Sequence, residues 1–119
     1  MNRSVLKDHG IDCDTGVERC LNNETLYASI LTMFLDDTSM AAAASAHGRR
    51  DNKALFTSAH ELKGASGSAA LADLYAAASA LVECLRKGEA DGDEVDRLFL
   101  KMEKEYSRAR EGVSLALAD

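Results

Sequence analysis

Apolar residues recur at helical spacing along nearly the whole chain, and no stretch shows a sustained alternation of apolar and polar residues. Residues Leu71, Leu74, Ala78, Leu81 and Leu85, for example, follow one another at intervals of three or four. No proline interrupts the chain, and alanine and leucine, which favour helices, are abundant. The pattern predicts an all-α fold, and 119 residues are enough for one domain with a single hydrophobic core.

Glycines and helix-capping residues divide this pattern into segments. The expected helices cover about Asp14 to Leu21, Asn23 to His47, Asp51 or Asn52 to a break at Gly67-Ser68, Leu71 to Gly88, and Asp91 to Gly112, which closes or kinks the last one. Short connections between long amphipathic segments imply antiparallel neighbours. We therefore predict an antiparallel four-helix bundle over residues 14–112, preceded by a lead or short helix over 1–13 and followed by a tail over 113–119.

The formal charge of −6 argues against binding to nucleic acid, whose phosphates require a basic surface. No apolar run approaches the roughly 20 residues of a membrane span, and the N-terminus lacks the apolar core of a signal peptide, so we expect a cytoplasmic protein. Cys13, Cys20 and Cys84 are odd in number and include no C-x-x-C pair. We predict reduced thiols in the core rather than a metal or redox site.

The candidate functional residues lie together in residues 59–67. On a helix, at about 100° per residue, Lys63 and Gly64 flank the line through His60, and Gly67 returns almost beneath it. A glycine inside a helix costs about 1 kcal/mol relative to alanine, so two glycines on one face suggest that another molecule approaches closely there. The spacing predicts a docking surface with His60 at its centre.

The spacing His-x-Leu-Lys-Gly-x-Ser, preceded by alanine, resembles the motif of the histidine-containing phosphotransfer (HPt) domains of phosphorelays. The residues that carry the resemblance are Ala59, His60, Leu62, Lys63, Gly64, Ala65 and Ser66. Looser similarity extends from about Ile11 to about Arg110. The family usually has glycine ten residues after the histidine, where this chain has Ala70.

The resemblance implies that His60 accepts a phosphoryl group, at Nε2, and exchanges it with the aspartate of a response-regulator receiver domain. A neutral imidazole, with an ordinary pKa of about 6.5, is a competent nucleophile at pH 7. Lys63, on the same helix face, is placed to offset the phosphate charge. Gly64 and Gly67 would admit the partner, and we predict that Phe56, one turn before His60, is an exposed apolar contact for it.

By the same resemblance, the Mg²⁺ and the catalytic carboxylates would come from the receiver domain, so we predict no metal site and no cofactor in this chain. The chain would be a phosphocarrier rather than an enzyme, and a monomer. Its partners would be a receiver domain, a hybrid sensor histidine kinase, or both.

Two other functions remain open at this point. The chain could be the phosphoacceptor domain of a chemotaxis-type histidine kinase, with ATP as the phosphate source, or a helical adaptor in which His60 performs no chemistry. A di-iron bundle is disfavoured because the sequence has no Glu-x-x-His pair. His9 and His47 lack a comparable sequence setting.

Overall fold

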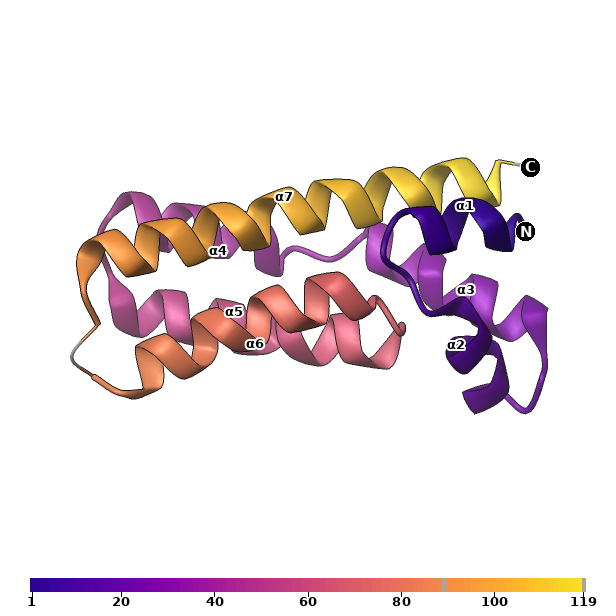
Figure 1. Cartoon of the computed structure of the whole chain (residues 1–119), viewed down its shortest axis with the longest axis horizontal. Helices are drawn as coiled ribbons and strands as arrows, with labels where there is room; N and C mark the ends of the chain where they lie inside the picture. Colours follow the sequence, from indigo (N-terminus) through magenta and orange to yellow (C-terminus); the bar gives the residue numbers. More distant parts are fainter. Residues whose placement is uncertain (89, 119) are drawn as a thin grey trace.

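The computed structural model describes residues 1–88 and 90–118, and in these the chain is helical without any strand (Figure 1). The helices are α1 Arg3–Asp8, α2 Cys13–Arg19, α3 Glu24–Leu35, α4 Ser39–Gly48, α5 Asn52–Ser68, α6 Ala72–Arg86 and α7 Gly92–Leu117. The predicted all-α class is confirmed.

Helices α4, α5, α6 and α7 run side by side along the long axis of the molecule, and short turns join them in antiparallel order (Figure 1). Helices α1, α2 and α3 gather at the end where α7 finishes. The bundle interior is filled by fully buried side chains, among them Leu55, Leu62, Leu81, Met102 and Val113. Burial of each such side chain contributes about 1.5–3 kcal/mol. The antiparallel four-helix bundle with short N-terminal helices was therefore predicted correctly.

The prediction of one helix from Asn23 to His47 is wrong, because α3 ends at Leu35 and α4 begins at Ser39. The Asp37 carboxylate accepts hydrogen bonds from the backbone N–H of Ser39, at 3.0 Å, and from its hydroxyl. The Asp37 side chain thus competes with the helix by bonding the backbone in a non-helical conformation. The break lets α3 turn away from the line of α4 and pack against α7.

Helix α2 and the end of α5 also differ from the prediction. Helix α2 begins one residue earlier than expected, because the carboxylate of Asp12 rather than that of Asp14 caps it by accepting from the Thr15 N–H at 3.3 Å. Helix α5 continues through Gly67 to Ser68, and the chain reverses at Ala70, whose φ is +58°. Ala70 thus adopts the left-handed conformation for which glycine is the usual residue.

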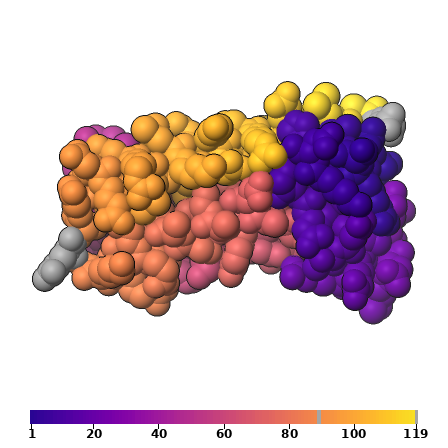
Figure 2. All heavy atoms as spheres, in the orientation of Figure 1, coloured from indigo at the N-terminus to yellow at the C-terminus, as the bar shows by residue number. Residues whose placement is uncertain are grey.

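The prediction that Gly112 closes the last helix is wrong. Helix α7 runs on to Leu117, with Val113 and Ala116 buried. A Cβ at position 112 would lie 2.5 Å from the Cβ of His9, so this glycine makes room for the turn after α1. The residues predicted as a tail are therefore helical and packed as far as Leu117, while residue 119 lies outside the described residues. Figure 2 shows the N-terminal segment covering the end of the bundle beside α7.

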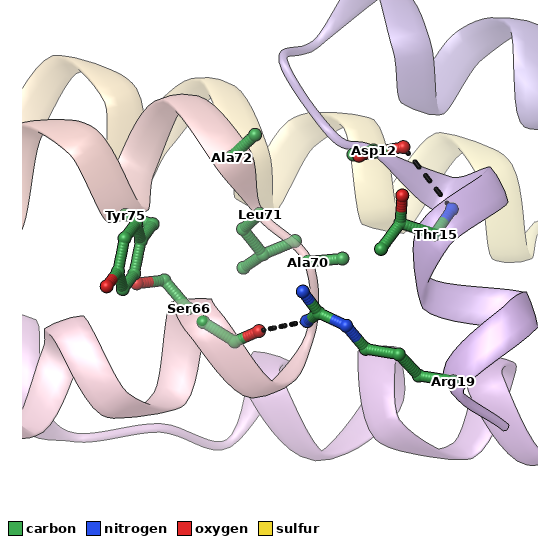
Figure 3. Close-up of a pocket in the computed structure, with 9 residues that line it drawn as sticks. Asp12, Thr15, Arg19, Ser66, Ala70, Leu71, Ala72 and Tyr75 are labelled. Atoms are coloured by element: carbon green, nitrogen blue, oxygen red, sulfur yellow. Dashed lines mark hydrogen bonds between the residues drawn. The ribbon is translucent and has the colours of Figure 1, made fainter.

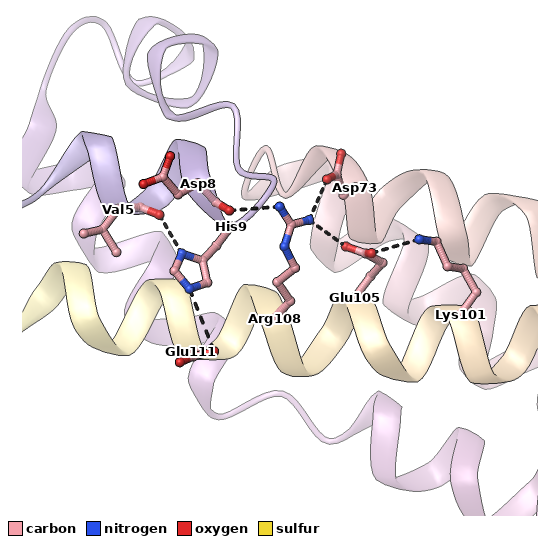
Figure 4. Close-up of polar contacts among 8 residues, drawn as sticks. All are labelled: Val5, Asp8, His9, Asp73, Lys101, Glu105, Arg108 and Glu111. Atoms are coloured by element: carbon pink, nitrogen blue, oxygen red, sulfur yellow. Dashed lines mark hydrogen bonds and ion pairs between the residues drawn. The ribbon is translucent and has the colours of Figure 1, made fainter.

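A polar network fastens this N-terminal segment to the bundle (Figure 4). Arg108 donates to the Asp8 carbonyl at 2.9 Å and pairs with Asp73 at 2.8 Å and Glu105 at 3.1 Å. Lys101 pairs with Glu105 from the other side at 3.0 Å. Burial alone would raise the pKa of Glu105, but these two cations outweigh it and hold the pKa below its ordinary value. One arginine thereby joins α1, α6 and α7.

The three cysteines are free and buried, as predicted. Burial raises the pKa of the Cys13 and Cys84 thiols, which keeps them in the unreactive protonated form. Among the described helices, none is long and apolar enough to cross a membrane.

Candidate functional site

Helix α5 carries the predicted site on the side that it turns away from the core. Its N-terminus is capped by Asp51, whose carboxylate accepts from the Ala54 N–H at 3.0 Å. The buried side consists of Leu55, Ser58, Ala59, Leu62 and Ser66. His60 is exposed and lies about 12 Å along the helix from its first residue. The imidazole is therefore held by a well-anchored stretch of helix and not by a frayed end.

Ser66 faces inward and is fully buried. Its hydroxyl donates to the carbonyl of Leu62, at 2.8 Å, and lies 3.0 Å from that of Lys63. Because it satisfies backbone acceptors within its own helix, Ser66 has a structural role.

The imidazole of His60 lies beside the Phe56 ring, with 6.0 Å between the ring centroids and 32° between the planes. Phe56, predicted as an exposed apolar contact, is half-buried, so only part of its ring is open to a partner. The Arg86 guanidinium, from α6, lies 5.7 Å from the centroid of the same Phe56 ring. Within residues 1–88 and 90–118, no hydrogen bond engages either nitrogen of the His60 ring, which leaves both available to a partner.

Lys63 follows His60 by one turn and is half-buried at the edge of α5 that faces α6. Its Nζ lies 5.9 Å from the centroid of the Tyr75 ring, which projects from α6 and is 42% exposed. The attraction between an ammonium group and the face of an aromatic ring is worth about 0.5–1 kcal/mol at exposed sites. The cation of the candidate site is thus contacted by a residue of the neighbouring helix.

Gly64 and Gly67 have different surroundings, although both lie inside α5. A Cβ at Gly64 would meet nothing within 4 Å, so this glycine leaves an open surface next to His60. A Cβ at Gly67 would lie 3.2 Å from the Tyr75 ring. The Gly67 carbonyl also accepts a hydrogen bond from Arg19 of α2, at 3.0 Å. Of the two glycines predicted to admit a partner, Gly64 has the geometry for it, and a docking role for either remains a prediction.

A hollow of about 410 Å³ lies beyond Gly67, where α2 approaches the turn between α5 and α6 (Figure 3). Arg19 and Tyr75 stand on opposite sides of it, and Ala70 and Leu71 form its floor. His60 does not line this hollow. The His60 imidazole is exposed instead on the outer side of α5.

A second, mostly apolar groove of about 350 Å³ lies on the other flank of α5, between α3 and α5. Ile30 and Met33 line it from α3, and Ala65 and Ser68 line it from α5. Met33 is 71% exposed, although it is a large apolar residue. Large exposed apolar side chains beside a groove are typical of protein-binding surfaces.

Tyr75, Arg86 and Met33 were missed in the sequence because each lies on a helix other than α5. Tyr75 and Arg86 are eleven residues apart, which is close to three helical turns, so they share a face of α6. That spacing was visible, but nothing in the sequence placed this face beside Lys63 and Phe56. Among the described residues there is also no group of three or more His, Cys, Asp or Glu side chains arranged to hold a metal ion.

Comparisons with known proteins identify the family and the fold of the chain. The sequence model of one family, described as the Hpt domain, matches residues 29–112, which include all of α5 and α6. No curated protein matches the chain. Among solved structures, the chain is similar to the crystal structure of the HPT domain from an Hpt sensor hybrid histidine kinase of Shewanella, with a TM-score of 0.82 and 18% sequence identity.

That similarity covers 92% of this chain and 95% of the Shewanella chain, and at this identity it establishes the fold. The family match, which spans more than half of the chain, establishes the relationship. The chain belongs to the Hpt domain family and is a phosphotransfer module of a phosphorelay.

Proposed function

We propose that His60 accepts a phosphoryl group from the aspartyl phosphate of a receiver domain and returns it to such an aspartate. The observation that carries this proposal is an exposed imidazole in the middle of α5 with a lysine one turn further on and an open glycine beside it, in a chain of the Hpt family. In the neutral ring Nδ1 keeps its proton, and the Nε2 lone pair attacks phosphorus. The N–P bond forms as the P–O bond to the aspartate breaks, and the electron pair leaves with the carboxylate.

Lys63 supports this reaction as a positive charge next to the transferred group. A phosphoryl group on His60 would bring negative charge to this face of α5. Within α5, Lys63 is the basic side chain that lies one helical turn from His60. Mg²⁺ and the carboxylates that bind it belong to the receiver domain in this proposal, and the chain contributes the nucleophile, the charge and the docking surface. We place the exchange in the cytoplasm, in keeping with three free thiols, and expect the chain to act as a monomer.

The receiver domain docks, in this proposal, on the surface formed by Phe56, His60 and Gly64. Gly64 admits its loops, and Phe56 offers the exposed part of its ring. The groove beside Met33 extends this surface along α5 with apolar area that has no partner within the described residues. A Phe56→Ala variant should bind a receiver more weakly and receive phosphate more slowly. Wild-type affinity and rate in that variant would remove Phe56 from the docking surface.

The experiment that tests the proposed function is intact-mass measurement after incubation with a phosphorylated receiver domain, for wild type beside His60→Gln. We expect one acid-labile phosphate on the wild type and none on the variant. If the wild type took up no phosphate from a competent donor, the alternative function, a helical adaptor in which His60 performs no chemistry, would be favoured. Phosphate acquired only from ATP and a kinase domain would favour the chemotaxis-type alternative.

A further inference from the structure

Three contacts in series link Lys63 to Tyr75, Tyr75 to Gly67, and Gly67 to Arg19. The Lys63 ammonium lies over the Tyr75 ring, at 5.9 Å from its centroid. The edge of the same ring lies against the backbone of Gly67, where a Cβ would come within 3.2 Å of two ring carbons. The Gly67 carbonyl is held in turn by Arg19, at 3.0 Å (Figure 3). Lys63, Tyr75 and Gly67 therefore form one contact chain across α5 and α6.

The position of the Lys63 ammonium needs such a contact. A lysine side chain has four rotatable bonds and a compact, strongly hydrated charge, so it occupies many rotamers unless something selects among them. Within the described residues Lys63 makes no ion pair, whereas the face of an aromatic ring attracts its ammonium electrostatically. Tyr75 is the group in contact with the ammonium that can restrict it.

The position of the Tyr75 ring depends on Gly67. A separation of 3.2 Å is shorter than an ordinary contact between carbon atoms, so a side chain at position 67 would push the ring outward by a few tenths of an ångström. Glycine costs helix stability inside α5. Accommodation of the Tyr75 ring explains this glycine within the chain, without any docking partner.

We propose that Tyr75 is a positioning residue, which holds the Lys63 ammonium beside His60, and that Gly67 provides the space for its ring. This inference rests on the proposed phosphoacceptor role of His60. It changes the expected role of Gly67 from a contact for the receiver domain to a support for the charge that stabilises the phosphoryl group.

The first test is NMR spectroscopy of the whole chain, because a proton above an aromatic ring is shifted upfield by the ring current. The ε-CH₂ protons of Lys63 should be shifted upfield in the wild type and in Tyr75→Phe, which keeps the ring. They should return to ordinary lysine values in Tyr75→Leu, and they should change in Gly67→Ala. Identical Lys63 shifts in wild type and Tyr75→Leu would overturn the proposal.

The second test measures how fast phosphoramidate phosphorylates His60, because this small donor requires no docking surface. Tyr75→Leu should slow the reaction by about two- to fivefold, the factor that a cation–π contact at an exposed site supplies. Tyr75→Phe should react at the wild-type rate. In a Lys63→Ala background, Tyr75→Leu should have no further effect, because the two residues act through one contact.

Two results would overturn the positioning role. One is an equal loss of rate in Tyr75→Phe and Tyr75→Leu, and the other is a loss that persists in the Lys63→Ala background. The failure of the proposed function itself would look different. In that case the wild type would take up no phosphate, while the ring-current shifts would still report whether Tyr75 holds Lys63.

Discussion

Gly64→Ala should make the protein more stable and less active. Gly64 lies inside α5, where alanine is favoured over glycine by about 1 kcal/mol. Outside its own stretch of helix, the new methyl group would meet no atom within 4 Å, so no steric clash within the chain would reduce this gain in stability. We expect the free energy of unfolding to rise by about 0.5–1 kcal/mol, which corresponds to roughly 2–5 °C in melting temperature for a chain of this length.

The same methyl group should slow phosphotransfer from a receiver domain. It would project from the surface on which we propose that the receiver docks, and an extra methyl in a fitted contact costs about 1–3 kcal/mol. At 1.4 kcal/mol for each factor of ten, kcat/KM for the transfer should fall by roughly five- to 150-fold. Phosphorylation of His60 by phosphoramidate should stay near the wild-type rate, because the small donor does not cover Gly64.

Urea unfolding followed by circular dichroism measures the first effect, and rapid-quench transfer from a phosphorylated receiver measures the second. A loss of stability would show that the position is not open within the chain. Greater stability with an unchanged rate of receiver transfer would show that the receiver does not approach Gly64. A matched loss with phosphoramidate and with the receiver would place the effect on His60 chemistry instead of docking.

Three further substitutions test the packing that supports the site. Gly112→Ala should lower the free energy of unfolding by about 1–3 kcal/mol, because its Cβ would overlap that of His9, and a gain in urea stability would contradict this. Tyr27→Phe should cost about 1–3 kcal/mol in the same assay, since its hydroxyl donates to the buried Ala69 carbonyl at 2.6 Å, and an unchanged urea midpoint would contradict it. The pKa of Glu105 is lowered in the folded protein by the two cations shown in Figure 4, against the effect of burial, so its stabilisation is complete at neutral pH and is lost as the pH falls through that lowered pKa. Urea titrations at acid pH, below the ordinary glutamate pKa of about 4.3, should therefore show a smaller advantage of wild type over Glu105→Gln than titrations at pH 7. A constant difference would refute the assignment.

The sequence predicted the helices and the bundle because the information for both is local. Apolar spacing identifies the buried face of each helix, and capping residues such as Asp51 and Asp91 mark where helices begin. The break between α3 and α4 escaped detection because apolar residues and alanines continue on both sides of it and no glycine or proline marks it. The end of α7 was misplaced because a glycine stops a helix in one context and makes room for a neighbour in another.

The same distinction applies to the site. His60, Lys63 and Gly64 lie on one helix, so their spacing alone was enough to bring them together in a prediction. Tyr75 and Met33 reach the flanks of α5 from α6 and α3, and their positions depend on how the helices pack. Residues that belong to a site through tertiary packing have no local signal in a single sequence.

The structure shows, for each glycine inside a helix, whether packing within the chain explains why glycine is there. In the described residues, Gly16, Gly64, Gly67 and Gly112 lie inside helices, where each costs about 1 kcal/mol relative to alanine. A Cβ at three of them would overlap or press on a neighbouring side chain, so packing within the chain accounts for the glycine. At Gly64 the same construction meets nothing. A destabilising residue with no internal cause points to an external one, and Gly64 lies one turn from the exposed imidazole at which, in the proposed function, a phosphorylated receiver domain arrives.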